Sequence, residues 1–213
     1  LTGNIGKPSS GLYPLWGQNN AQGVCDMGCL PDSYPGYQPV ADPEAGKKFQ
    51  TAWGVNLNPV PGLSLAEICD AVMDRRIRAL YIIGSDPALS MAGAQKVRNA
   101  LEKAEFIVAQ DIFFNETAKF ADVVLPVASF AEKDGTFTNT ERRVQRVRQA
   151  IEPIGNSRPD WEIICDLAKR LDARGFDFAC PSDIISEIAS VAPIFRGICY
   201  SRLEEESLQW PCL

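Results

Sequence analysis

Short apolar runs alternate with helix-spaced apolar positions in the middle of the chain. The runs at 79–83, 106–109 and 123–125 are too short, and too closely flanked by turn residues, to be helices. Between the first two, apolar residues recur with helical spacing over 94–101. This pattern predicts parallel strands joined by a helix, as in an α/β fold with a Rossmann-like parallel sheet and flanking helices.

Polar residues follow each of these predicted strands, at the edge where such sheets bind ligands. The residues at these strand ends are Gly84, Asp86, Ser90, Gln110, Asp111, Pro126 and Ser129, and all but Gly84 and Pro126 have polar side chains. A strand-end Asp can accept bonds from a guanine edge or a ribose, each contributing about 1.5–3 kcal/mol. Asp86 and Asp111 could instead cap the following loops or helices, and for either residue alone we favour that interpretation. Three strand ends together favour a nucleotide-type site, although no G-x-G-x-x-G or Walker sequence names the nucleotide.

The flanking segments predict less regular structure. Residues 1–40 show neither helix nor strand period and are expected to be loop, either functional or simply crossing the molecule. Gln18 belongs to a run of amide side chains there. Helices are predicted at 43–53, 63–75, 160–171 and 182–189, with Asp160 in the first turn of the third, and the chain beyond 192 is expected to be loop.

Residues 131–151 predict a β-ribbon that turns at Thr140-Glu141 and carries four arginines. A solvated strand face is favoured over phosphate or carboxylate binding for these arginines. The expected organisation is a loop-rich segment at 1–40, an α/β dinucleotide-binding portion at 41–130 and a smaller α+β portion at 131–213.

Composition narrows the function classes. The 213 residues are 46% hydrophobic and 23% charged, typical of an ordinary globular protein, and the net charge of −6 does not suggest a nucleic-acid or anionic-membrane partner. Seven dispersed cysteines without a C-x-x-C pair, and no histidine, argue against a metal site built wholly within this chain. Cys69 is expected to be a small core residue rather than a reactive one. The chain begins at Leu1 rather than Met, so we expect it to be a piece of a longer protein. We also expect a cytoplasmic location.

Several motifs carry a resemblance across nearly the whole chain. They are GNIGKP at 3–8, GQNN at 17–20, CDMG at 25–28, ADVVLP at 121–126, EKDGTFTN at 132–139 and RPDW at 158–161. Together they resemble the molybdopterin oxidoreductase family, and the stretch from GQNN to CDMG resembles its formate dehydrogenase branch.

The resemblance implies two molybdopterin guanine dinucleotides (bis-MGD) on a molybdenum or tungsten ion, with a 4Fe-4S cluster in a missing N-terminal part. It places Gln18 close to the metal and Asp160 beside the second cofactor. Implied contacts to the guanosine and phosphate end of one dinucleotide, or to the same cleft, are Gly84, Asp86, Ser90, Gln110, Asp111, Thr117 and Ser129. The implied partners are the rest of the catalytic subunit, iron–sulfur or other electron-transfer subunits, and formate. Alone, the piece is expected to be inactive and to self-associate.

One position departs from the branch pattern. Formate dehydrogenases carry an arginine directly before GQNN that is thought to orient the substrate carboxylate, and this chain has Trp16 there. Tryptophan lacks the bidentate cationic fork, so formate as the substrate is less securely implied. The alternative is a non-catalytic scaffold of a respiratory electron-transfer complex, as in the large iron–sulfur subunit of complex I.

Overall fold

The computed structural model describes residues 2–15 and 17–212. Contacts divide the chain into two compact units, each assembled from distant segments. Unit 1 comprises Leu1–Pro61, Gly135–Val147 and Phe178–Leu213, and unit 2 comprises Gly62–Asp134 and Arg148–Asp177. The three consecutive segments expected from the sequence do not coincide with these units, and as domains they stay a prediction.

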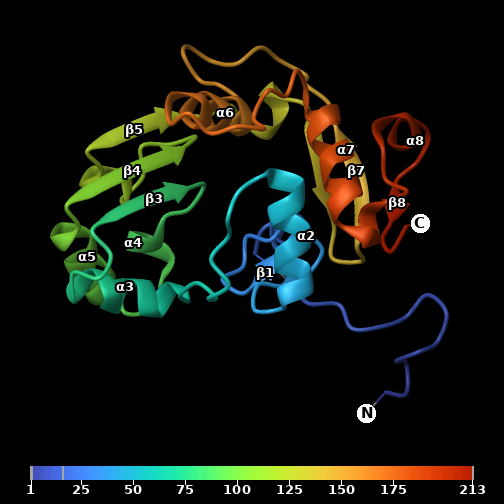
Figure 1. Cartoon of the computed structure of the whole chain (residues 1–213), viewed down its shortest axis with the longest axis horizontal. Coiled ribbons are helices and arrows are strands. Elements are labelled where there is room, and N and C mark those ends of the chain that lie inside the picture. Colours follow the sequence, from blue (N-terminus) through green and yellow to red (C-terminus); the bar gives the residue numbers. More distant parts are fainter. Residues whose placement is uncertain (1, 16, 213) are drawn as a thin grey trace. The chain divides into compact units, whose positions relative to one another are not determined.

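Unit 2 contains the predicted parallel sheet (Figure 1). Its strands are β3 (Ala79–Ile83), β4 (Phe106–Asp111) and β5 (Val123–Pro126), in that order across the sheet. Both pairings are parallel, with Ile83 opposite Gln110 and Asp111 opposite Pro126. The carboxyl ends of neighbouring strands therefore lie side by side, and the expected fold class is confirmed.

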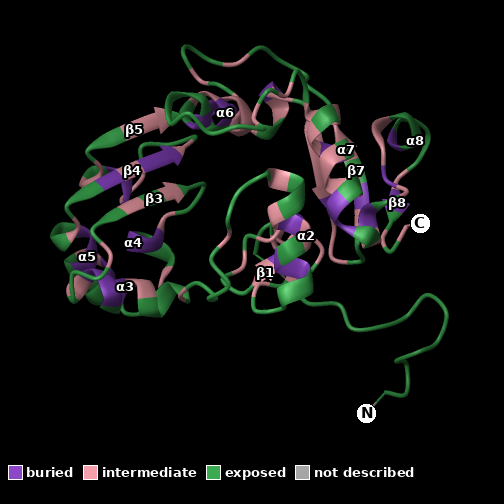
Figure 2. Ribbon diagram, viewed as in Figure 1, coloured by how far each residue is buried: buried purple, intermediate pink, exposed green. Residues whose placement is uncertain are grey.

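Helices complete unit 2. They are α3 (Leu65–Met73), α4 (Pro87–Ser90), α5 (Ala94–Lys103), α6 (Asp160–Arg170) and the short η1 (Ala118–Phe120) and η2 (Phe130–Glu132). Apolar faces of α3 and α5 pack with β4 through Val72, Val97 and Ile107. Cys69 belongs to this core, as predicted. Buried positions concentrate on the central strand β4 (Figure 2), because only that strand is paired on both sides.

Unit 1 is built on an antiparallel sheet. Its elements are α1 (Ala21–Asp26), β1 (Ser33–Tyr34), β2 (Gln38–Pro39), α2 (Pro43–Trp53), β6 (Gly135–Thr138), β7 (Arg143–Val147), α7 (Pro181–Val191), η3 (Pro193–Phe195), α8 (Tyr200–Glu205) and β8 (Leu208–Gln209). Strand β7 is central, between β6 and β8. The predicted ribbon is confirmed, and α2 has the predicted limits, with Asp42 as N-cap and Gly54 left-handed at its end.

Two expectations of irregular structure are wrong. Helix α1 and the β1–β2 pair lie within the segment expected to be loop, and η3, α8 and β8 follow residue 192. These elements have two to six residues each, too few to show a period in the sequence. Tertiary bonds stabilise them instead, for example the pairing of β8 with β7.

The ribbon arginines differ in exposure: Arg142 and Arg148 are exposed, as expected for a solvated strand face, whereas Arg146 is not. Arg146 has only 9% of its side chain exposed, lies 3.8 Å from the centre of the Tyr200 ring, and pairs with Glu204 at 2.9 Å. Arg142 lies 5.0 Å from the Trp210 ring centre. Arg146 therefore packs between an aromatic ring and a carboxylate and serves the fold of unit 1, so the expectation of a solvated side chain is wrong for this arginine.

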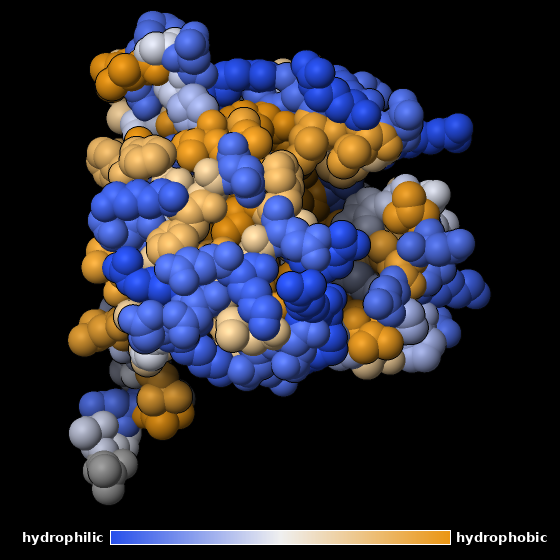
Figure 3. All heavy atoms as spheres, turned by 90° about the vertical axis from the view of Figure 1, so that its left-hand side faces the viewer, coloured by the Kyte–Doolittle hydropathy of each residue, from blue (hydrophilic) through white to orange (hydrophobic). Residues whose placement is uncertain are grey.

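Apolar side chains also reach the surface of unit 2. Phe106 at the start of β4 is 45% exposed, and Ile83 at the end of β3 is 43% exposed. The face shown in Figure 3 carries apolar patches between hydrophilic side chains. Within the described residues, every helix is too short or too polar to cross a bilayer.

Candidate functional site at the strand ends of unit 2

The loop after β3 opens the site. Gly84 directly follows this strand and has a left-handed backbone (φ +59°), which glycine adopts without a steric cost. Its N–H donates to the Gln110 carbonyl at 2.8 Å. A Cβ built on Gly84 would have no atom within 4 Å, so the backbone here is open to a ligand. Ser85 follows and is exposed.

Asp86 ties the loop after β3 to the loop after β4. Its Oδ1 accepts the Thr117 hydroxyl at 2.6 Å and the Thr117 N–H at 3.0 Å, and its Oδ2 accepts the Glu116 N–H at 3.3 Å. The fully buried Thr117 oxygen in turn accepts the Ala88 N–H at 3.1 Å. Asp86 occupies the N-cap position of α4 without making a cap bond, so the capping alternative is wrong for its side chain.

Asp111 arranges the loop that follows β4. Its Oδ1 accepts the Phe113 N–H at 3.1 Å, and its Oδ2 accepts the Asn115 amide at 3.1 Å. The capping alternative therefore holds in part, since the carboxylate shapes its own loop. Two accepted bonds leave lone pairs available on a half-buried carboxylate. Phe113 and Phe114 beside it are 73% and 68% exposed.

Gln110 is the centre of a chain of polar side chains. Its side chain is fully buried, accepts the Tyr81 hydroxyl, and donates to Asp160 Oδ1 at 2.9 Å. The other Asp160 oxygen pairs with Lys133. The chain links β3, β4 and the first turn of α6. Burial is the main cause that raises the pKa of Tyr81, with a smaller effect from Asp160, so its hydroxyl stays a donor.

Ser129 and Ser90 have local roles. Ser129 is the N-cap of η2, and its N–H donates to Glu132 at 2.7 Å. Glu132 also accepts the Ile154 N–H at 2.9 Å. The bonds from the Ser129 N–H, the Ser129 hydroxyl and the Ile154 N–H hold the pKa of the buried Glu132 carboxyl below the usual range. Ser90 is exposed and donates to the Asp86 carbonyl at 2.8 Å.

The predicted site residues of unit 2 thus gather at one edge of the sheet. Gln18 belongs to unit 1, where it is exposed, and Trp16 lies outside the described residues. Sequence reasoning did not assign roles to Tyr81 and Lys133. The alternation of side chains along a strand could have indicated Tyr81. Side chains two residues apart lie on the same face, so Tyr81 shares a face with Ile83 at the end of β3. Lys133 reaches Asp160 from a distant loop, which no local pattern reveals.

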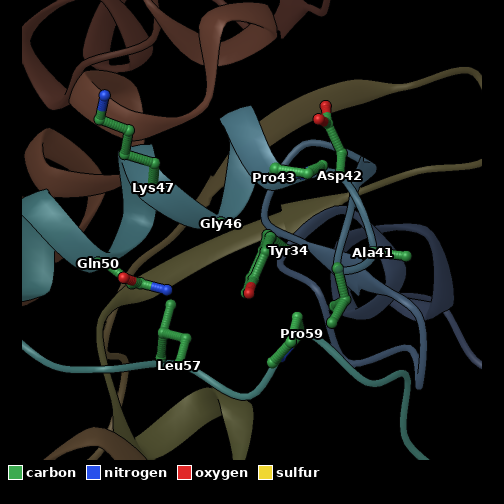
Figure 4. A pocket seen from close by; sticks show the side chains of 10 residues that line it. Tyr34, Ala41, Asp42, Pro43, Gly46, Lys47, Gln50, Leu57 and Pro59 are labelled. Atoms are coloured by element: carbon green, nitrogen blue, oxygen red, sulfur yellow. The ribbon is translucent and has the colours of Figure 1, made fainter.

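A separate hollow of about 300 Å³ lies in unit 1 beside α2. The Tyr34 hydroxyl and the Gln50 amide point toward it above Leu57 and Pro59, whereas Lys47 and Asp42 point away (Figure 4). It contains none of the predicted site residues. This hollow is therefore not the counterpart of the strand-end site.

The strand-end site fits the polar end of a nucleotide. It offers an open glycine backbone at Gly84, the exposed hydroxyls of Ser85 and Ser90, and spare carboxylate lone pairs on Asp111. Exposed aromatic rings stand beside these groups, at Phe113 and Phe114. Among the described residues, no group of three or more His, Cys, Asp or Glu side chains is arranged to hold a metal ion.

Comparison with known proteins gives the family. The model of the molybdopterin oxidoreductase family matches residues 1–170. The chain belongs to this family. The family name implies a molybdopterin cofactor, which agrees with a nucleotide-type site at the strand ends.

Two relatives match the whole chain. The "F420-dependent formate dehydrogenase subunit alpha" of Methanocaldococcus jannaschii is 50% identical over 100% of this chain and 31% of its own length. A Staphylococcus haemolyticus protein named "Putative formate dehydrogenase" is 48% identical over 99% of this chain and 21% of its own. The chain therefore spans about a fifth to a third of these relatives.

A solved structure shows the same fold. Acetylene hydratase from Pelobacter acetylenicus superimposes with a TM-score of 0.59 over 78% of this chain and 24% of the hydratase. The sequence identity is 18%, so this likeness supports the fold and not the reaction.

Replacing Thr117 by valine tests the link between the two loops. Thr117→Val keeps the shape but removes the bond to Asp86 and leaves the Ala88 N–H without an acceptor. We expect the free energy of unfolding in urea to fall by about 1–3 kcal/mol. Ser90→Ala, which removes an exposed bond, should change it by less than about 0.5 kcal/mol. Equal effects of the two substitutions would contradict a special role for Asp86.

The lowered pKa of Glu132 predicts a pH-dependent contribution to stability. A carboxyl whose folded pKa lies below its ordinary 4.5 stabilises the fold above pH 4.5, and this contribution is lost as the pH falls through the folded pKa. Glu132→Gln should therefore lower the melting temperature most at pH 7, with a smaller difference from the parent at pH 3. The exposed Glu102→Gln is the control. A deficit that is the same at both pH values would refute this account.

Proposed function

We propose that the chain is part of the catalytic subunit of a molybdenum or tungsten oxidoreductase of the formate dehydrogenase type. The observation that carries this proposal is the gathering of Gly84, Asp86 and Asp111 at adjacent parallel strand ends, in a chain of the molybdopterin oxidoreductase family. A ligand with a nucleotide end suits that position and those groups.

Each strand-end residue has a proposed task toward one of two pterin guanine dinucleotides. Gly84 lets the backbone approach the phosphates, and the hydroxyl of Ser90 lies on the same side of the loop. Asp111 accepts bonds from the guanine edge or the ribose with its remaining lone pairs. Asp86 and Thr117 keep the two loops in register, so that this cradle exists before the ligand arrives.

Gln110, Ser129 and Asp160 support the site from behind. Gln110 and Asp160 bond to each other at 2.9 Å, and Asp160 also pairs with Lys133, so α6 is fixed to the strand end. The first turn of α6, which contains Asp160, then faces the second dinucleotide. Ser129 places the η2 turn at the end of β5.

The proposed reaction is the oxidation of formate to carbon dioxide, which releases one proton and two electrons. When bound, the metal–pterin group supplies the two-electron chemistry, and the protein supplies binding and orientation. Gln18 is proposed to lie beside the metal and donate hydrogen bonds from its amide. A 4Fe-4S cluster elsewhere in the subunit and further electron-transfer subunits would carry the electrons away. A cytoplasmic location is part of this proposal.

Trp16 is the reason for testing the substrate directly. A tryptophan at this position cannot form a charged, bidentate pair with the formate carboxylate. Another cation of the full-length subunit would have to take that role. A scaffold without metal is the competing function, and it would have no use for such a cation.

The full-length subunit, purified without oxygen, tests the proposal. We expect stoichiometric molybdenum or tungsten, two pterin guanine dinucleotides, and reduction of a dye by formate. Trp16→Arg should lower the KM for formate by about tenfold, as expected for one recovered charge-assisted bond. A folded subunit without metal and pterin would identify the scaffold. Metal and pterin with no formate turnover in either protein would show that the substrate is different.

A further inference from the structure

Asp26 is a fully buried carboxylate in unit 1, outside the strand-end site. It is the last residue of α1 and has 0% exposure. Its Oδ1 accepts the Gln22 amide at 2.7 Å and the Tyr37 hydroxyl at 2.9 Å, and its Oδ2 accepts the Trp210 indole N–H at 2.7 Å. The Asp26 carbonyl also accepts the Gly36 N–H at 2.7 Å.

Opposing effects act on this carboxylate. Burial raises the pKa of Asp26, whereas the bonds from Gln22, Tyr37 and Trp210 and the charge of Arg142 lower it. Burial, followed by the bond to Asp26, raises the pKa of Tyr37, so its hydroxyl remains a donor. A buried carboxylate is tolerated only when such bonds are made, and each removed donor leaves part of its desolvation uncompensated.

Trp210 is itself held firmly. Its backbone N–H donates to the Arg142 carbonyl at 3.0 Å, and the Arg142 guanidinium lies 5.0 Å from its ring centre. Trp210 is 184 residues from Asp26 along the chain. The bond between them therefore ties the end of α1 to the C-terminal segment.

The start of α1 has a second long-range tie. The Asn20 side-chain oxygen accepts the Thr138 N–H of β6 at 2.9 Å, from 118 residues away. A Cβ on Gly23 would come within 2.3 Å of that oxygen, so the glycine makes room for the bond. Both ends of this six-residue helix are thus fastened to distant segments, although a helix this short is not stable alone.

Gln18 lies directly before this helix. Its carbonyl accepts the Ala21 N–H at 3.3 Å, which joins it to the first turn. The Gln18 side chain is exposed, so its position depends on the backbone that bears it. The position of the Gln18 backbone therefore depends on α1.

We infer that Asp26 and Trp210 are positioning residues that hold the Gln18 segment in place for the reaction. This inference rests on the proposed function. Neither residue touches the reacting atoms, and both act through α1. A misplacement of about 1 Å in such a segment costs on the order of 100-fold in rate, so even a partial loosening is measurable.

The test compares two Trp→Phe substitutions in the full-length subunit. Trp210→Phe removes the indole donor to Asp26 and keeps an aromatic ring. Trp53→Phe is the matched control, because the Trp53 indole also donates to a carboxylate, Glu187, at 3.1 Å in unit 1, away from α1. Hydrogen exchange of residues 17–26, metal and pterin content, and kcat and KM for formate are measured for both.

We expect faster exchange over 17–26 in Trp210→Phe, a kcat lower by about tenfold, and unchanged metal and pterin content. Trp53→Phe should show neither the faster exchange nor the lower kcat. Unchanged exchange in Trp210→Phe would show that the bond to Asp26 does not hold residues 17–26 in place. Faster exchange with an unchanged kcat would show that holding this segment does not matter for the reaction. If Trp210→Phe does not fold, Tyr37→Phe replaces it. Tyr37→Phe removes the hydroxyl that donates to Asp26, and the Tyr37 ring is partly exposed, so the substitution disturbs the core less.

The two hypotheses fail in different ways. A parent subunit without metal, pterin and formate turnover would refute the proposed function, and with it the catalytic part of this inference. The exchange measurement needs no turnover, so it still decides whether Asp26 and Trp210 hold the segment. A lower kcat in Trp53→Phe as well would show that any loosening of unit 1 impairs the enzyme, which contradicts a specific role.

Discussion

Parallel pairing of β3, β4 and β5 is the constraint on which the site of unit 2 depends. With Ile83 opposite Gln110 and Asp111 opposite Pro126, the loops that leave neighbouring strands start side by side. Polar groups separated by many residues then meet at one edge without any local motif. The hydrogen bond from the Gly84 N–H to the Gln110 carbonyl continues this pairing just beyond the sheet.

Buried and partly buried carboxylates fasten the loops that the sheet alone leaves unsupported. Asp86 joins two loops through Thr117, Glu132 joins the η2 turn to Ile154, and Asp26 joins α1 to Trp210. In each case the acceptor oxygens take several donors, which is the condition for keeping a carboxylate out of water. Such bonds are directional, so they position a loop as well as stabilise it.

Strong local signals made much of this fold predictable from the sequence. The three strands, helix α5 and the capped helix α2 each carry a period or a cap in their own residues. Asp86 and Asp111 could be found because they follow strands. Helix α1, strand β8 and the bond between Lys133 and Asp160 could not, because they depend on partners far along the chain. The burial of Arg146 could not be predicted for the same reason, since Tyr200 and Glu204 lie in a later segment.

The central claim is that the strand ends of unit 2 bind the guanosine end of a dinucleotide. An anaerobic crystal structure of the full-length subunit tests it most directly. The account predicts nucleotide density against the Gly84 backbone, with a guanine or ribose group within hydrogen-bond distance of the Asp111 carboxylate. Density for a protein segment packed over Gly84 and Asp111, with the nucleotide bound elsewhere, would contradict it.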